Sequence, residues 1–351
     1  MAVHEDSALV PEYFRRLEEA FAEAALSAGV VERRLGVAGR ILRLRFAGPA
    51  LAEVLLPALA HLRTDTASVD GTIRLWDTES TGVPVPSFPW DPTDWGPRGT
   101  IRGFGGERIR LHFDPAAGTL TMFDPARSTA VFAVASAGAV PWYERAAPLR
   151  PALHWLLGAA SRHLVHAGVV ARDAHGLLIG GAGGAGKSTV AVRCLEAGFD
   201  YLGDDYVLVS LDGAPVAFSL YATAKLDPAS LALMPWLESA ITAHDGLNDG
   251  RRKAVLPVYD LRRDRLRPSA TLSAIVLPSV TGEPKSRLRG VSATEALRTL
   301  APSTIIQMPH EAGAALDTFA RLVQATPSYR LELGTDVDAV PSLLDGLLAE
   351  P

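Results

Sequence analysis

The stretch Leu177–Asp205, LLIGGAGGAGKSTVAVRCLEAGFDYLGDD, decides the fold class of this chain. An apolar run at 177–179 predicts a short buried strand, and the pattern from Thr189 to Ala197 predicts a helix that Gly198 ends. Between them, residues 181–188 match G-x-x-x-x-G-K-[ST] at every fixed position. Strand, Gly-rich loop and helix occur in the order that a phosphate-binding loop requires, so a chance Gly-rich turn is the weaker interpretation.

This loop predicts a binding site for the cofactors ATP and Mg²⁺. Glycines let backbone N–H groups converge on phosphate oxygens without Cβ clashes, and the N-terminus of the following helix adds to the same field. Lys187 can reach the β- and γ-phosphates, and the Ser188 hydroxyl can ligate Mg²⁺. The residues expected to hold the nucleotide are Gly181, Gly183, Gly184, Ala185, Gly186, Lys187, Ser188 and Thr189.

A pair of adjacent carboxylates, Asp204 and Asp205, follows the predicted helix after a short apolar run. Beside a triphosphate, one carboxylate can coordinate Mg²⁺ while the other accepts a proton from an attacking hydroxyl. Taken alone, Gly-Asp-Asp is ordinary turn chemistry. The phosphate loop upstream favours the catalytic interpretation.

Length, charge and composition limit the classes of protein to which this chain can belong. A chain of 351 residues suggests about two domains. The net charge of −5 gives no sign of a polyanion-binding protein, so we expect no nucleic-acid partner. The N-terminus lacks an apolar signal segment and no long apolar run occurs, so we expect no membrane partner and a cytoplasmic location. The single cysteine, Cys194, is interpreted as a small core residue.

The pattern of predicted elements is α/β with a smaller module at the N-terminus. A helix, a strand pair, a second helix and a strand predict an α+β module over residues 1–104, which ends in a Pro/Trp-rich linker. Trp90 and Trp95 in this linker are interpreted as loop packing residues. Alternating strands and helices then predict one α/β domain over residues 105–351.

The segment from His166 to Asp205 resembles the HPr kinase/phosphorylase group, P-loop serine kinases whose core is similar to that of phosphoenolpyruvate carboxykinases. In that family a histidine, a phosphate loop and a double aspartate follow one another with similar spacing. The resemblance implies a kinase core of this type over residues 105–351. It also implies that Asp204 is the general base, that Asp205 and Ser188 hold the metal, and that Lys187 is catalytic. His166 would tune the base, although a lone histidine is more often a packed or capping residue.

The chain also departs from the bacterial regulators of this family. Thr189 stands where they usually have Glu, Ala167 follows His166 with Gly168 one place later, and their Arg-Gly-Leu-Gly segment is absent. These departures argue against HPr as the substrate and against phosphorylase activity. The chain is more similar to divergent HPr-kinase-related proteins, some of which are found beside genes for ribosomally made peptides such as lasso peptides. That resemblance implies a peptide or protein serine as the phosphate acceptor, recognised by the N-terminal module, and points toward a homo-oligomer.

Two basic stretches downstream could complete the site. Phosphoryl transfer needs positive charge on the γ-phosphate beyond the loop lysine, and the candidates are Lys225, Arg252 and Lys253. The alternative for each is a solvated basic loop. Two other functions stay open at this point, a small-molecule kinase on the same scaffold and a regulatory module that binds ATP without transferring phosphate.

Overall fold

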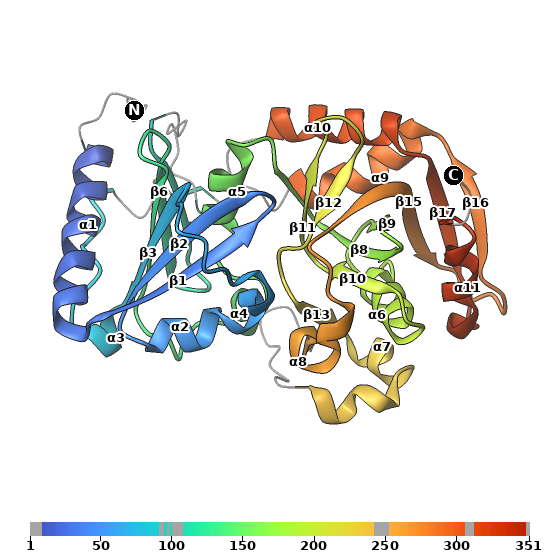
Figure 1. Ribbon diagram of the computed structural model, residues 1–351, viewed down its shortest axis with the longest axis horizontal. Coiled ribbons are helices and arrows are strands. Elements are labelled where there is room, and N and C mark those ends of the chain that lie inside the picture. The colour runs from blue at the N-terminus through green and yellow to red at the C-terminus, as the bar shows by residue number, and fades with distance from the viewer. Residues whose placement is uncertain are drawn as a thin grey trace. The chain divides into compact units, whose positions relative to one another are not determined.

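The computed structural model describes residues 9–90, 95–96, 99, 108–241, 253–305 and 312–348. Over these residues the protein is a mixed α/β protein with three sheets (Figure 1). They form two compact units, with the boundary between Ala160 and Ser161. No helix among them is both long and apolar enough to cross a membrane.

Unit 1 is a six-stranded mixed sheet in the order β1-β2-β3-β6-β5-β4. Helix α1 (Leu9–Ala28) packs against β2 and β3, and helix α5 (Arg150–Gly158) packs against β5 and β6. Successive strand residues point to opposite faces, so Met122 of β5 joins the core beneath α1 while Phe123 stacks on Trp155 of α5. The other elements are β1 (Val30–Val37), β2 (Arg40–Ala47), α2 (Ala50–Leu55), β3 (Gly71–Asp77), α3 (Thr78–Thr81), β4 (Arg110–Asp114), β5 (Thr119–Asp124), β6 (Thr129–Val134) and α4 (Trp142–Ala146).

The boundary between the units lies farther along the chain than residues 104/105, where the sequence placed it. Strand β6 pairs in parallel with β3, so strands β4 to β6 complete the sheet of unit 1 and belong to it. Separating them would expose unpaired backbone groups along the whole edge of β3. The Pro/Trp-rich stretch is therefore a connection within unit 1. Its tryptophan packing is confirmed, because Trp90 is buried in edge-to-face contact with Tyr13 and Trp95 packs against the same cluster.

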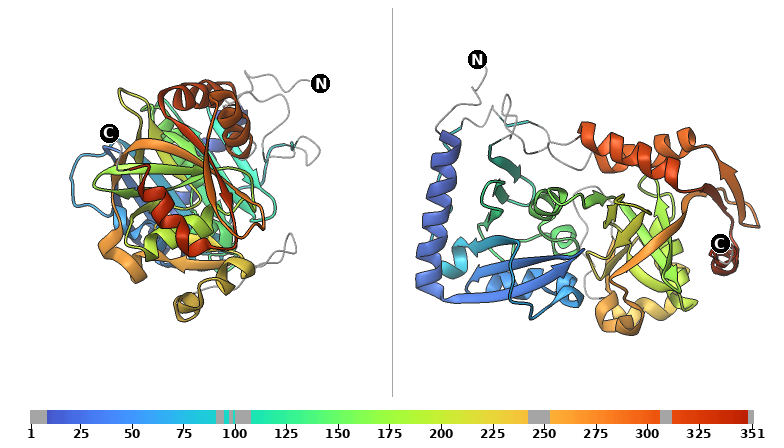
Figure 2. Two further views of the ribbon diagram at one scale, coloured as in Figure 1. Left: turned by 90° about the vertical axis from the view of Figure 1, so that its right-hand side faces the viewer. Right: turned by 45° about the horizontal axis from the view of Figure 1, so that its top comes forward.

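Unit 2 is built on the long strand β15 (Ser269–Val280), which lies at the centre of a nine-stranded sheet. One edge of β15 pairs in parallel with β9, and the other pairs with β12 and then β17. Helix α6 packs on one face, above Ile179, and helices α9 and α10 cover the other face, above Leu178 (Figure 2). Because successive side chains of β9 point to opposite faces, this strand contributes to the hydrophobic core on both sides of the sheet.

The remaining elements of unit 2 have the following bounds: β7 (His163–Val165), β8 (Ala167–Arg172), β9 (His175–Gly180), α6 (Lys187–Glu196), β10 (Asp200–Gly203), β11 (Val207–Ser210), β12 (Val216–Phe218), β13 (Thr223–Leu226), α7 (Pro228–Ala232), β14 (Ala254–Pro257), α8 (Val258–Arg262), β16 (Arg287–Val291), α9 (Ala293–Ile305), α10 (Ala312–Ala325), β17 (Ser328–Leu333) and α11 (Val340–Asp345). Strands β13 and β14 form a separate two-stranded sheet, and α11 packs against α6.

Candidate active site

The phosphate-loop motif forms the connection from β9 to α6. Gly181, Gly184 and Gly186 all have positive φ, at 139°, 80° and 99°, a region that favours glycine. A Cβ at Gly186 would also lie 2.6 Å from a methyl carbon of Leu333, so this position admits no side chain without rearrangement. The sequence pattern thus fixes the loop through both backbone conformation and packing.

Lys187 folds back across its own loop. Its ammonium donates to the carbonyl oxygens of Gly181 at 2.9 Å and Ala182 at 3.1 Å, and the residue is 7% exposed. Burial lowers the pKa of Lys187, the charges of Asp204 and Asp205 oppose this, and the charge of Lys253 lowers it further. The loop lysine, the acid pair and Lys253 therefore lie within electrostatic reach of one another.

Two antiparallel segments bring His166 opposite the acid pair. Val165 pairs with Val207, and Val169 pairs with Gly203, so residues 166–168 face residues 204–206. A Cβ at Gly168 would lie 3.2 Å from the carbonyl oxygens of both residue 203 and residue 204. The absence of a side chain at Gly168 lets the two segments approach at the site.

Both carboxylate oxygens of Asp205 contact protein side chains. Oδ1 is 3.0 Å from His166 Nε2, and Oδ2 accepts a hydrogen bond of 2.6 Å from the Lys225 ammonium. Burial alone would raise the pKa of Asp205, but the Lys225 charge and the contact with His166 hold it well below its ordinary value of 3.8. A metal ion ligated directly by Asp205 would have to compete with the Lys225 ammonium.

Asp204 differs from its neighbour because one of its oxygens has no partner. Oδ2 accepts the Lys225 backbone N–H at 2.9 Å, whereas the buried Oδ1 has no hydrogen-bond partner among the residues described. Burial raises the pKa of Asp204 above 3.8, and the Asp205 charge adds to the rise. The Lys225 amide, the nearby Ser188 hydroxyl and the Lys187 charge oppose it. A buried carboxylate with a raised pKa and a spare oxygen is suited to accept a proton.

Three supporting contacts were not identified from the sequence. The His166 backbone N–H donates to Thr304 Oγ1 at 2.8 Å, and the Tyr206 ring lies 5.1 Å from the imidazole, centroid to centroid. The Thr189 hydroxyl is 2.7 Å from Ser230 Oγ on α7. The sequence holds no local signal for Thr304 or Ser230, because each lies far along the chain from its partner.

The structure thus brings together Asp204, Asp205, His166, Lys187 and Ser188. Lys225, which the sequence suggested as a phosphate contact, instead bonds both carboxylates. Arg252 lies outside the described residues. Within the described part of the chain, no group of three or more His, Cys, Asp or Glu side chains is placed to hold a metal ion. Mg²⁺ fits such a site, because it binds through one or two protein oxygens, phosphate oxygens and water.

Replacing Lys225 by methionine is expected to destabilise the protein by about 1–3 kcal/mol at neutral pH. Among the residues described, the change leaves Asp205 with His166 as its one side-chain partner, and Lys225 and Asp205 are 10% and 24% exposed. Because the pKa of Asp205 is lowered, its contribution is present above 3.8 and lost as the pH falls below that value. Urea unfolding at several pH values measures this.

The matched control is Lys285→Met, since Lys285 is exposed in the same unit and should change the free energy of unfolding by less than about 0.5 kcal/mol. Equal stability of Lys225→Met and the native chain at neutral pH would contradict the assigned role of the ion pair.

Comparison with solved structures matches the chain to the HPr(Ser) kinase/phosphatase from Coxiella burnetii, with a TM-score of 0.30 and 10% sequence identity. The match covers 52% of this chain and 95% of that chain. No protein-family model and no curated protein matches the chain.

Proposed function

We propose that this chain is an ATP- and Mg²⁺-dependent kinase that transfers the γ-phosphate to a hydroxyl group, that of a serine in a peptide or protein. The observation that supports this most directly is the environment of Asp204. Oδ1 of Asp204 is buried and unpartnered, and Ser188 and Lys187 of the phosphate loop both lower the pKa of the Asp204 carboxyl. Leaving a carboxylate oxygen buried without a partner costs stability, and nucleotide binding alone does not require it.

In the proposed reaction, Asp204 Oδ1 accepts the proton of the acceptor hydroxyl while the hydroxyl oxygen attacks the γ-phosphorus. The new O–P bond forms as the bond from the γ-phosphorus to the bridging oxygen breaks, and ADP leaves. Lys187 exchanges its bonds to the carbonyls of Gly181 and Ala182 for phosphate oxygens. Lys253 adds positive charge near the transferred group.

The metal fits the same set of residues. Ser188 would ligate Mg²⁺ directly, with the phosphates and water supplying the other oxygens, and Asp205 would contact it through water because Lys225 already occupies Oδ2. When bound, Mg²⁺ neutralises charge on the phosphates. Keeping Asp205 ionised is the task of Lys225 and His166.

The choice of serine rests on the sequence resemblance from His166 to Asp205. The test is incubation of the full chain with γ-labelled ATP, Mg²⁺ and serine-containing peptides, with small hydroxyl compounds in parallel. Phosphoserine on a peptide is the expected product. Label on small compounds alone would assign a small-molecule kinase, and nucleotide binding without any transfer would assign a regulatory module.

The rate of transfer is expected to fall at acidic pH along a limb set by Asp204. A base works only when ionised, and the pKa of Asp204 is raised above 3.8 by burial, so the loss begins at a higher pH than for an ordinary aspartate. Asp205 contributes nothing in this range, because its pKa is lowered. A profile of kcat/KM against pH, which reports the pKa values of groups in the free enzyme, measures the limb, and a limb centred at or below 3.8 would contradict the assignment.

A further inference from the structure

One face of the sheet in unit 1 places arginines directly beside one another. Arg34 of β1 pairs in register with Arg43 of β2, and Arg45 of β2 pairs with Arg74 of β3. Residues paired in register project from the same face, with Cβ atoms roughly 5 Å apart. We call Arg34, Arg43, Arg45 and Arg74 the arginine cluster.

Carboxylates are scarce in the arginine cluster. Glu32 is 3.4 Å from Arg34 and 3.9 Å from Arg45, so one acid serves two guanidinium groups. Glu18 of α1 pairs with Arg74 and is shared with Arg127.

Arg43 stands out among the four. It has no carboxylate within 4.0 Å among the residues described, and its Nη2 donates to Thr72 Oγ1 at 3.2 Å. Like charges directly opposite on a sheet are destabilising, so the fold maintains the Arg34–Arg43 pair at a cost.

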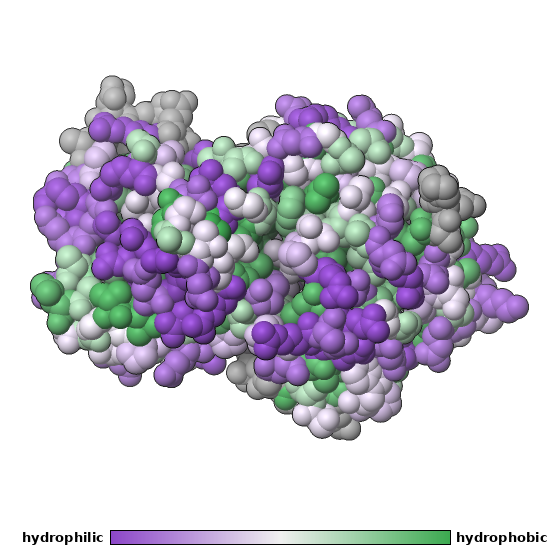
Figure 3. Space-filling model, viewed as in Figure 1, coloured by the Kyte–Doolittle hydropathy of each residue, from purple (hydrophilic) through white to green (hydrophobic). Residues whose placement is uncertain are grey.

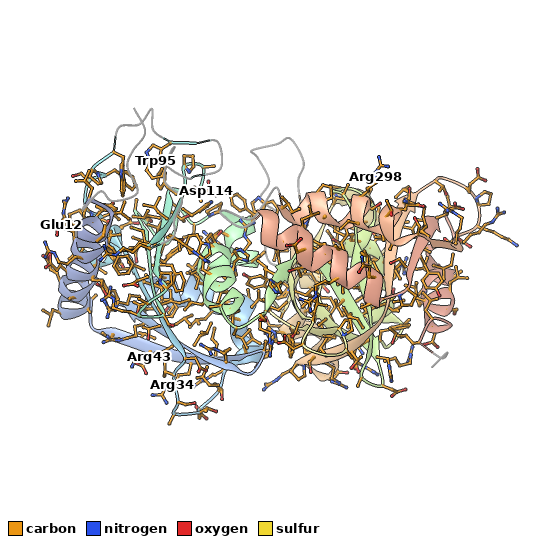
Figure 4. The ribbon with its side chains drawn as sticks, turned by 90° about the horizontal axis from the view of Figure 1, so that it is seen from above. Glu12, Arg34, Arg43, Trp95, Asp114 and Arg298 are labelled. Carbon is orange, nitrogen blue, oxygen red and sulfur yellow. The ribbon has the colours of Figure 1, made fainter. Side chains whose placement is uncertain are left out.

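The charge of this region differs from that of the whole chain. On the face of β1 and β2 that carries the cluster, Arg34, Arg43 and Arg45 stand beside one acid, Glu32, a net charge of +2 (three minus one), whereas the full chain has −5. Hydrophilic side chains gather over β1 and β2 in Figure 3, and Figure 4 shows Arg34 and Arg43 close together on this ribbon. Arg34 and Arg45 are each 34% exposed, so their guanidinium groups are accessible from solvent.

We propose that the arginine cluster docks an acidic peptide segment. Guanidinium groups bind carboxylates through paired, charge-assisted hydrogen bonds, which suits aspartate and glutamate side chains. A uniform polyanion such as nucleic acid fits less well, because Glu18 and Glu32 border the cluster and would repel closely spaced phosphates. Carboxylates spaced along a peptide can contact the arginines and avoid these acids. The site lies within unit 1 and requires no nucleotide, so its test is separate from that of kinase activity.

The test measures binding of a short labelled peptide, with glutamate at alternate positions, to the full chain by fluorescence anisotropy without ATP. Binding should weaken between about 50 mM and about 500 mM salt, because surface charges are screened. Arg43→Glu should weaken it by about tenfold or more. The same change replaces a like-charge pair by an opposite-charge pair, so the melting temperature should rise by about 1–3 °C. Loss of binding with a rise in stability cannot come from misfolding.

The matched control is Arg298→Glu, which makes the same charge change at an exposed arginine of α9 in unit 2 and should leave binding within about twofold. Equal weakening by both variants would overturn the proposal, as would equal binding of a glutamine version of the peptide. Tighter binding of an oligonucleotide of the same charge would assign the cluster to nucleic acid instead. Should Arg43→Glu unfold the protein, Arg43→Gln supplies the same comparison.

Discussion

Asp204→Asn is expected to lower kcat by about 10²- to 10⁴-fold, or about 3–5 kcal/mol in the activation free energy, while ATP still binds. Asparagine keeps the size of aspartate and a side-chain oxygen that can accept the Lys225 backbone N–H, which now bonds Oδ2 at 2.9 Å. It cannot take up the proton of an attacking hydroxyl. The change therefore removes the proposed base and leaves in place Lys187 and Ser188, which we propose hold the phosphates and Mg²⁺.

The variant should also be at least as stable as the native chain at neutral pH. The pKa of Asp204 is raised in the folded state, so its ionised form is penalised above 3.8, and asparagine relieves that penalty. Calorimetric titration with ATP and Mg²⁺ measures whether the variant still binds ATP. Urea unfolding measures its stability. Transfer at the native rate would show that Asp204 is not the base. Loss of both ATP binding and stability would show instead that Asp204 holds the site together.

Much of unit 2 could be predicted from local sequence. The apolar run before the loop is β9, and Gly198 has the positive φ of 86° expected of a left-handed cap. Asp212–Gly213 is a dipeptide typical of a hairpin turn, and β11 and β12 on either side of it pair antiparallel. Helix α6 begins at Lys187, two residues before the predicted start, with Gly186 as its N-cap. These features depend on neighbours within a few residues, which sequence patterns capture.

The division of the chain into units could not be predicted in this way. Strands β4 to β6 have the pattern of a meander that could extend either unit. The parallel pairing of β3 with β6, between residues more than fifty positions apart in the chain, assigns them to unit 1. Periodicity indicates that a strand forms and which face is buried, and it does not name the partner strand. The same limit explains why Thr304 next to His166 carried no signal.

The candidate site falls between these cases. Asp204, Asp205 and Lys187 could be selected from spacing alone, because a phosphate loop followed by an acid pair is a local pattern. The role of Lys225 could not be predicted from the sequence. Its sequence suggested a contact to phosphate, whereas the structure shows its ammonium on Asp205 and its backbone N–H on Asp204. Lys225 thereby gives the two carboxylates different environments. It keeps Asp205 ionised, and it leaves one oxygen of Asp204 without a partner.

Lys187→Met should produce a different loss of activity, since it removes the charge that we propose binds phosphate and not the proposed base. Removing one preorganised group of this kind lowers kcat by about 10²- to 10³-fold, and here ATP affinity should fall as well, by about tenfold or more. Asp204→Asn is expected to retain that affinity. The ratio of the two ATP dissociation constants therefore separates the lysine from the aspartate, even though both variants lose activity.

The loss in Lys187→Met should not come from unfolding. Burial lowers the pKa of Lys187, so the ammonium is held at a desolvation cost that methionine removes. Against this, the carbonyls of Gly181 and Ala182 lose their donor, but Ala182 is exposed and its carbonyl can bind water. The two effects oppose each other, and urea unfolding should detect a change of less than about 1 kcal/mol. With stability preserved, unchanged ATP affinity in this variant would mean that the Gly-rich loop does not bind the triphosphate, and the kinase assignment would fail with it.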